Sequence, residues 1–450
     1  VGVILVGIVA LLATNKKLVE TLKNIYKIEE LRSRILFTLG LLLIYRLGSF
    51  VTLPGVDHAI LQQWTQNFAS DSSSLMGLLN IFSGGAFSQA SIFALGVMPY
   101  ITASIIIQLL GIMVPYFRKM QREGESGRRR MNQWTRFLTI AVLLLQAPAY
   151  LATQVLSSGA VTVTGDFLGI ANGQFIVPAV VILIAGTMFI MWLGEKITDK
   201  GIGNGISLII MIGIVARLPQ SFLQEFMFQT TGGGSIIMLL VELIFLALVF
   251  MMAIAIVQAV RKIPVQYAKR IVGNKQYGGV RQYIPLKLNA ANVMPIIFAQ
   301  ALMFIPGLIW GGQWLDITSF WYNFTLVVLV IAFTYFYTAI IVNPQMMADD
   351  MKRNGGFIPG VKPGKSTVSY IDDIMTRITL PGSVFLAIIT ILPAIAMTLG
   401  ITQGFAYFFG GTSLLIMVGV VLDTLKQIES YLLMRHYDGL MKTGRIQGRY

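Results

Sequence analysis

Side chains able to carry out catalytic chemistry are scarce in this chain of 450 residues. It contains no cysteine, which excludes disulfides, thiolate metal sites and thiol nucleophiles. Its two histidines, His58 and His436, are far apart in the sequence, which favours ordinary loop or surface positions over a metal site or a proton relay. An aspartyl or serine active site would need paired residues, and the sequence offers no such pair. We therefore expect no enzyme activity, no metal and no cofactor.

Two glycine-rich segments are similar to phosphate-binding loops but lack their spacing. In Gly360–Ser366 the interval between the glycines is one residue short, and Pro363 removes a backbone N–H that a phosphate cradle would use. In Gly201–Gly205 the third glycine is misplaced, and a helix rather than a strand is predicted before it. We interpret this second segment as a tight turn that lets the helices on either side pack closely.

The elements that must carry the function are membrane-spanning helices. Hydrophobic residues make up 55% of the chain and charged residues 12%, whereas soluble domains carry about 25% charged residues. A bilayer core needs about 20 mostly apolar residues per helix. On that basis the sequence predicts ten spans, near 31–50, 91–113, 135–157, 175–194, 203–219, 236–260, 290–310, 323–343, 377–399 and 412–434.

The net charge of +14 is distributed very unevenly along the chain. Lysine and arginine gather before the first span, in alternate connections and in the tail, at 16–34, 114–134, 261–289, 344–376 and 435–450. The opposite connections contain neither residue type; they are 51–76, 158–174, 220–235, 311–322 and 400–411. Because positive residues stay on the cytoplasmic side, this pattern predicts that both termini are cytoplasmic.

Ten spans divide into two sets of five, and an odd number per half makes the second half enter the membrane from the opposite face. This is the topology of an inverted repeat, in which the functional site tends to lie between the halves. We predict an N-terminal half at 16–219 and a C-terminal half at 236–434, followed by a cytoplasmic tail at 435–450. The apolar stretch 1–15 is assigned no function.

Ionisable residues are few within the spans. Arg46 and Glu242 lie toward span ends, and we interpret these two and Asp423 as interfacial or paired structural charges. An ion-driven transporter usually needs ionisable groups deep in the membrane, where each is costly and persists for a purpose. This scarcity weakens a secondary transporter or lipid flippase as an alternative without excluding it.

One apolar segment, residues 75–90, is too short to span and is interrupted by Gly84 and Gly85. Irregular backbone at membrane depth is tolerated where protein or a water-filled cavity surrounds it. The segment is therefore either a re-entrant element that occupies a cavity from outside or an amphipathic helix at the membrane interface.

Several ordered motifs resemble the SecY family of protein-conducting channels. They are Asn80–Ala86, Ser91–Gln108, Glu123–Arg129, Met191–Glu195, Gly201–Ser207, Asn343–Pro344, Phe357–Gly360 and Phe409–Ile416, and the resemblance runs from about residue 16 to the C-terminus. It implies an all-α membrane protein of ten helices in an inverted five-plus-five clamshell with a re-entrant plug. The implied activity is passage of unfolded secretory polypeptides across the bacterial plasma membrane.

The resemblance also implies the residues of the channel. The pore would narrow at a ring of aliphatic side chains formed by Val97, Ile101, Ile206, Ile210, Ile297 and Ile416. The plug would contain Leu79, Asn80, Ile81, Phe82, Ser83, Gly84 and Gly85. The lateral gate, through which signal sequences and membrane helices leave for the lipid, would include Thr102, Ser104, Gln108, Asn292 and Gln300. For single residues, ordinary core packing or helix–helix contact remains open.

Partners of the chain follow from the same resemblance. The family implies the small subunits SecE and SecG, and energy from the SecA motor ATPase or the ribosome. The basic connections 261–289 and 344–376 would form the docking surface, with Arg270, Lys275, Lys352 and Lys362 as preferred contacts. Basic loops suit the phosphates of ribosomal RNA, although the positive-inside rule alone would also place lysines there.

Overall fold

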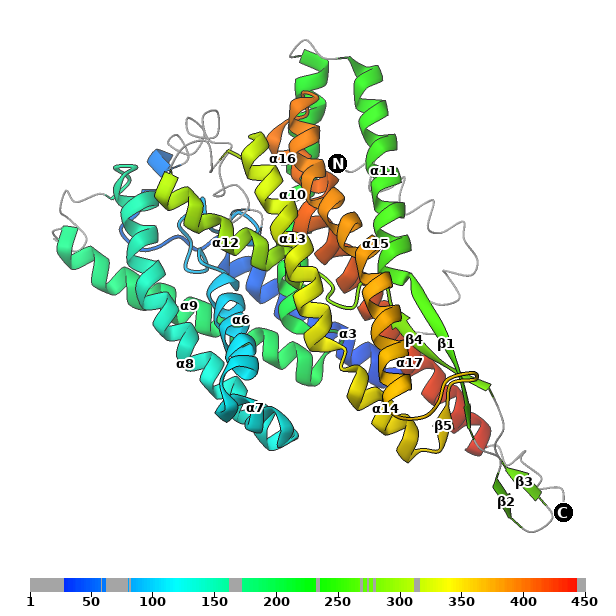
Figure 1. Ribbon diagram of the computed structural model, residues 1–450. Helices are drawn as coiled ribbons and strands as arrows, with labels where there is room; N and C mark the ends of the chain where they lie inside the picture. The colour runs from blue at the N-terminus through cyan, green and yellow to red at the C-terminus, as the bar shows by residue number, and fades with distance from the viewer. Residues whose placement is uncertain are drawn as a thin grey trace. The chain divides into compact units, whose positions relative to one another are not determined.

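The computed structural model describes residues 28–57, 59–61, 80, 82–161, 172–231, 235–267, 270–272, 275–277, 281–310 and 316–442 (Figure 1). The chain divides into two compact units. The first unit consists of Val1–Leu223 with Val420–Tyr450, and the second is Gln224–Gly419. Two long helices, α10 and α17, contribute residues to both units.

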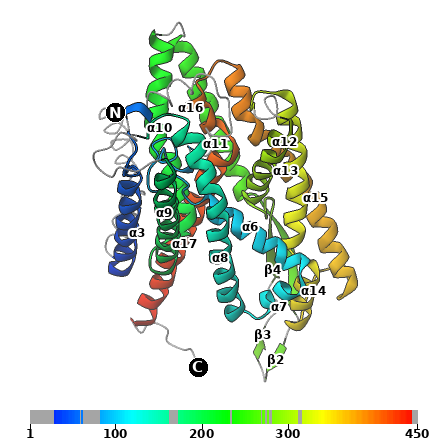
Figure 2. The ribbon, with the colours of Figure 1, turned by 90° about the vertical axis from the view of Figure 1, so that its left-hand side faces the viewer.

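The regular elements in the described part of the first unit are all helices, joined by turns and two isolated bridges, Thr52 with Ser91 and Val56 with Val161. Its elements are α3 (Glu29–Gly48), α6 (Met98–Met113), α7 (Pro115–Arg122), α8 (Glu125–Tyr150) with a π-helical turn (Leu151–Leu156), α9 (Asn172–Lys200), the start of α10 (Gly205–Thr231) and the end of α17 (Gly411–Lys442). Helix α8 packs against α6 and α9, and α9 also packs against α3 (Figure 2). An apolar core, which includes Leu143, Leu151 and Leu183, fills this unit.

The second unit combines helices with a small sheet. Its elements are α11 (Ile236–Gln258), β1 (Val260–Tyr267), β2 (Arg270–Val272), β3 (Lys275–Tyr277), β4 (Arg281–Lys287), α12 (Met294–Trp310), α13 (Phe320–Ile341), α14 (Pro344–Arg353), β5 (Gly356–Phe357), α15 (Lys365–Thr398), α16 (Gln403–Ala406) and a 3₁₀ turn (Tyr407–Phe409). Helix α13 packs against both α12 and α15.

Each of the ten predicted spans falls on a helix. Among the described residues, seven helices are long and apolar enough to cross a membrane by length and composition, and an eighth qualifies if α6 and α7 form one broken span. Helices α3 and α12 are not among these: α3 carries three arginines (Arg32, Arg34 and Arg46), and α12 has 17 residues, which is short for a span.

The predicted start of the second span at residue 91 was wrong. Ser91 forms an isolated bridge with Thr52, residues 92–97 form turns, and α6 begins at Met98. Gly96 has a φ of +54°, a conformation that a residue with a side chain rarely adopts. Pro99 then occupies the first turn of the helix, where its missing N–H costs nothing. The glycine and the proline together set this boundary.

The basic connection 261–289 is a sheet rather than a loop. Strands β1 and β4 pair antiparallel with Ile263 opposite Ile284, and β5 adds to the other edge of β1. The side chains of Ile263 and Val265 are buried against Met351 and Ile371, from α14 and α15. The basic residues of this hairpin are therefore presented on a folded element.

Candidate functional site

The predicted ring residues come from both units. Val97, Ile101, Ile206 and Ile210 lie in the first unit, at the starts of α6 and α10. Ile297 in α12 and Ile416 in α17 lie in the second. Val97, Ile210 and Ile416 are buried, and the other three are half-buried. By contrast, the apolar side chain of Leu240 in α11 is 57% exposed. That the six form one ring stays a prediction.

The start of α10 is held by side chains from three other helices. The amide of Ile202 donates to Thr38 Oγ1 in α3 (3.1 Å), that of Gly203 to Gln427 Oε1 in α17 (2.8 Å), and that of Gly205 to Thr198 Oγ1 in α9 (2.9 Å). The amides that the turn leaves without helical partners are thus satisfied. This network positions Ile206 and Ile210, which follow in the first turns of α10.

Residues 201–205 form the tight turn that the sequence predicts. A Cβ atom added to Gly205 would lie 2.0 Å from the carbonyl oxygen of Gly194 in α9, far inside van der Waals contact. One added to Gly194 would lie 2.8 Å from the side chain of Ile206. Glycine at these two positions therefore allows α9 and α10 to approach closely, and that prediction is confirmed.

Ile297 is oriented by its neighbour in sequence. Phe298 is buried, and its ring lies 5.4 Å from that of Phe333 and 5.0 Å from that of Tyr337 in α13, centroid to centroid. Successive residues of an α-helix are rotated by about 100°. The aromatic contact with α13 therefore turns Ile297 toward a different face of α12.

In the described part of the predicted plug, Asn80 and Phe82 are helical and half-buried, and Ser83, Gly84 and Gly85 form turns. Ser83, Gly84 and Gly85 are buried, with φ values of +65° and +96° at the two glycines. Arg46 Nη1 donates to the carbonyl of Gly84 (2.8 Å), and Tyr150 Oη donates to that of Phe87 (2.7 Å). Asn80 and Phe82 are also described, whereas Leu79 and Ile81 lie outside the described residues.

Gly84 lies against another glycine in the first unit. A Cβ atom on Gly84 would be 2.8 Å from Gly213 Cα in α10 and 3.1 Å from Arg46 Nη1. Sequence reasoning assigned Arg46 only as an interfacial or structural charge. Its partner Gly84 is 38 residues away along the chain, so no local sequence pattern could have revealed the contact.

The predicted gate residues on α6 make hydrogen bonds within that helix. Thr102 Oγ1 donates to the carbonyl of Met98 in the same helix (3.1 Å), and Gln108 Nε2 donates to Ser104 Oγ (3.5 Å). In the second unit, Gln300 Oε1 accepts from Thr412 Oγ1 of α17 (3.3 Å), and Asn292 is an exposed residue with φ +52° before α12. The gate stays a prediction.

The predicted docking residues all belong to the second unit. Arg270 and Lys275 lie in the paired strands β2 and β3. Lys352, in the last turn of α14, and Lys362 are exposed. Their role in docking stays a prediction.

Comparisons with known proteins identify the family. A sequence model of the SecY family matches residues 91–425. The protein translocase subunit SecY of Corynebacterium glutamicum is 41% identical, over 93% of this chain and 98% of its own length.

Solved structures share the fold. One described as the structure of a protein conducting channel matches with a TM-score of 0.59 and 19% identity, over 88% of this chain and 91% of the other. Sec61 in the canine ribosome-channel complex from the endoplasmic reticulum matches with a TM-score of 0.55 and 17% identity, over the same shares of the two chains. The chain belongs to the SecY family.

Proposed function

We propose that this chain is the central channel subunit of a protein translocase, which passes unfolded secretory polypeptides across a membrane. The observation that carries the proposal is the match to SecY along nearly the whole chain, joined to the fold of a protein-conducting channel. The apolar helices agree with a multi-pass membrane protein. The chain needs no catalytic site of its own, because partners supply the energy.

The seal of the channel is the ring of Val97, Ile101, Ile206, Ile210, Ile297 and Ile416. A narrow apolar constriction excludes water and ions by dewetting. Aliphatic side chains have no hydrogen-bonding preference, so the ring accepts chains of any sequence. The burial of Val97, Ile210 and Ile416 and the anchoring of α10 support this assignment.

The plug, residues 79–85, closes the resting channel from the non-cytoplasmic side. Its described part is held in the first unit by Arg46, which binds the carbonyl of Gly84, and Tyr150 binds the carbonyl of Phe87 just after the plug. Such hydrogen bonds do not depend on the plug's side chains. They hold the turn by its main chain, and a passing polypeptide displaces it by breaking a small number of polar contacts.

The lateral gate lies along α6 and α12, at Thr102, Ser104, Gln108, Asn292 and Gln300. Polar contacts between membrane helices are worth about 0.6 kcal/mol on average. Hydrogen bonds of this strength can hold the two helices together and can still be broken when a signal sequence enters between them.

Partners dock on the cytoplasmic surface of the second unit. We assign Arg270, Lys275, Lys352 and Lys362 to contacts with the ribosome or SecA, and we place SecE and SecG beside the helices in a bacterial plasma membrane. The pairing of β2 with β3 supports this assignment for Arg270 and Lys275, and the position of Lys352 in the last turn of α14 supports it for that residue. The distribution of lysine and arginine supports cytoplasmic termini.

Crosslinking of a stalled secretory chain tests the proposal. Because the chain contains no cysteine, single cysteines at Ile101, Ile206 and Ile297 give unambiguous adducts. We expect the stalled chain to crosslink to all three and not to a control cysteine at Leu240, which is exposed on α11. Equal crosslinking at Leu240 and at the ring, or adducts at Leu240 alone, would reject the pore assignment.

A further inference from the structure

A buried polar cluster in the second unit has no part in the proposed channel. Glu225 and Gln229 lie on one face of α10, Glu242 lies in α11, and Thr402 precedes α16. The two glutamates and the glutamine are 0%, 2% and 4% exposed. Burying a carboxylate is costly unless hydrogen bonds or opposite charges compensate, so the partners of each carboxyl decide its charge.

Glu225 is fully provided with donors. Its Oε2 accepts from the backbone amide of Thr402 (2.8 Å) and from the Thr402 hydroxyl, and its Oε1 accepts from Gln229 Nε2 (2.9 Å). A carboxylate that accepts two or three hydrogen bonds is stabilised in its charged form. Glu225 is therefore the favoured position for a negative charge.

Glu242 has far fewer partners. Its Oε1 accepts from the same Gln229 Nε2 (3.0 Å), and its Oε2 is buried with no hydrogen-bond partner in the described structure. Among the described residues, neither carboxyl forms an ion pair, and the ionisable group acting on Glu242 is Glu225. The connection between α10 and α11, residues 232–234, is three glycines and brings no charge.

Two ionised carboxylates that share one amide nitrogen would repel each other. The pair relieves this repulsion by taking up a proton, as coupled acidic groups do. The donors around Glu225 leave Glu242 as the proton carrier, since an unbonded oxygen costs less on a neutral carboxyl than on a charged one. We propose that Glu225 and Glu242 form a binding site for one proton, which resides on Glu242.

The site joins three segments that are distant in sequence. With the proton in place, Gln229 bridges the two carboxyls and Thr402 closes the cluster, so α10, α11 and the segment before α16 are fastened together. The proposal rests on this geometry and not on the channel function. Its failure would leave the pore assignment untouched.

Infrared spectroscopy of the purified, full-length protein at neutral pH tests the charge assignment directly. Ordinary carboxyls are ionised there, so a protonated carboxyl gives a carbonyl-stretch band of its own. We expect this band in the wild-type protein and in the control Glu125→Gln, which removes a carboxylate that is 81% exposed. We expect Glu242→Gln to abolish it. Absence of the band in the wild-type protein, or its persistence in Glu242→Gln, would overturn the proposal.

Thermal unfolding gives a second measurement. Glutamine mimics a neutral carboxyl, so Glu242→Gln should keep or raise the midpoint, whereas Glu225→Gln should lower it by several degrees because it removes the charge that Thr402 stabilises. An equal fall in the unfolding midpoint of the two variants would contradict the assignment of the proton to Glu242. So would a wild-type midpoint that depends on sodium or potassium at constant ionic strength, because a cation would then occupy the place of the proton.

Discussion

At the scale of single residues, two polar side chains of the first unit bind backbone carbonyls in or beside the predicted plug. Arg46 binds the carbonyl of Gly84, and Tyr150 binds that of Phe87. The guanidinium of Arg46 also lies 4.7 Å from the ring centroid of Phe50, which helps to hold its position. Charge at a span end is thereby used to hold an irregular segment in place.

Replacement of Arg46 by alanine should release the turn at Gly84. A hydrogen bond to a charged group contributes about 1.5–3 kcal/mol, and each 1.4 kcal/mol changes an equilibrium about tenfold. We expect the displaced state to become roughly 10- to 100-fold more populated, with a higher resting ion conductance in planar bilayers.

Two controls separate the parts of this prediction. Arg129→Ala, which alters an exposed ion pair, should leave the conductance unchanged. Deletion of residues 80–88 should raise it. If the deletion raises the conductance and Arg46→Ala does not, Arg46 has no holding role, and if neither does, the segment is not a seal.

At the scale of elements, the close contact of α9 and α10 depends on glycine. Gly205 begins α10 where the backbone of Gly194 leaves no room for a side chain. The same helix carries Ile206 and Ile210 in its next turns. A change in the packing of these two helices therefore also moves two predicted ring residues.

Gly205→Ala should destabilise the protein by about 1–3 kcal/mol, the usual cost of overpacking. The matched control is Gly40→Ala in α3, where an added Cβ atom meets nothing within 4 Å. Thermal unfolding of the two purified variants compares them. If Gly205→Ala lowers the unfolding midpoint by no more than Gly40→Ala does, the contact between α9 and α10 can be separated at little cost in stability.

The spans were predictable because lipid demands long apolar stretches, and each stretch became a helix. The β1–β4 hairpin was not predicted, since Pro264 and Pro285 argue against strands and its basic residues indicated an exposed loop. The alternation that buries Ile263 and Val265 was the available signal. The contacts of Arg46 and Glu242 could not be found, because folding alone brings their partners close.

At the scale of the whole molecule, the proposed functional residues are drawn from both units. Four of the six predicted ring residues come from the first unit and two from the second. The predicted docking residues belong to the second unit alone. Sealing and partner binding can therefore be tested by separate variants.

The double variant Ile206→Gly with Ile210→Gly should raise the resting conductance, because it widens and wets the constriction. Ile237→Gly with Ile244→Gly, at positions 76% and 61% exposed on α11, controls for glycine in a membrane helix. Planar-bilayer recording compares the two. An unchanged conductance in the first variant would contradict the seal.

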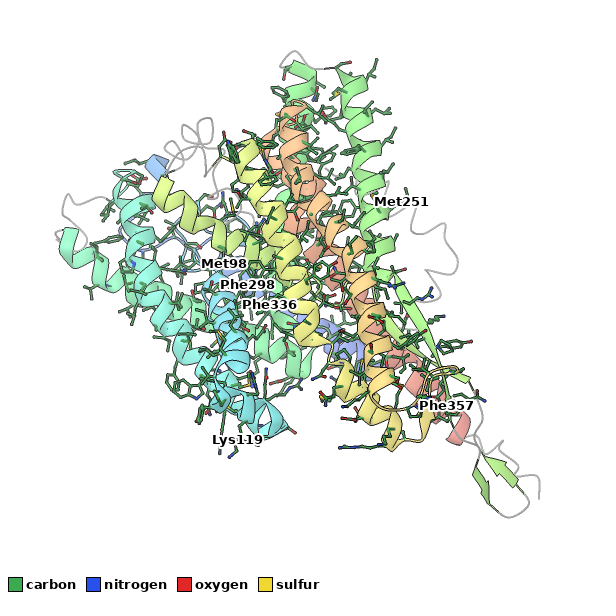
Figure 3. All side chains as sticks on the ribbon, viewed as in Figure 1. Met98, Lys119, Met251, Phe298, Phe336 and Phe357 are labelled. Atoms are coloured by element: carbon green, nitrogen blue, oxygen red, sulfur yellow. The ribbon has the colours of Figure 1, made fainter. Side chains whose placement is uncertain are left out.

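Lys352→Glu with Lys362→Glu should weaken binding of ribosomes and flatten its dependence on salt, by about 0.7–0.9 in logarithmic slope per lost phosphate contact. Lys119→Glu, on α7 of the first unit, tests whether any exposed basic residue would do (Figure 3). Sedimentation with ribosomes at several salt concentrations measures both. An equal effect of the control would indicate general surface charge instead of a docking site.

The meeting of Gly84 and Gly213, main chain against main chain, has a kinetic consequence. Interlocked side chains must change rotamer before two surfaces can separate, and they must be ordered again on return. Neither glycine has a rotamer to change. In the proposed plug cycle, reclosure after each translocated chain therefore need not wait for side-chain repacking at this contact, and the turn can move here at the pace of loop motion, in nanoseconds to microseconds.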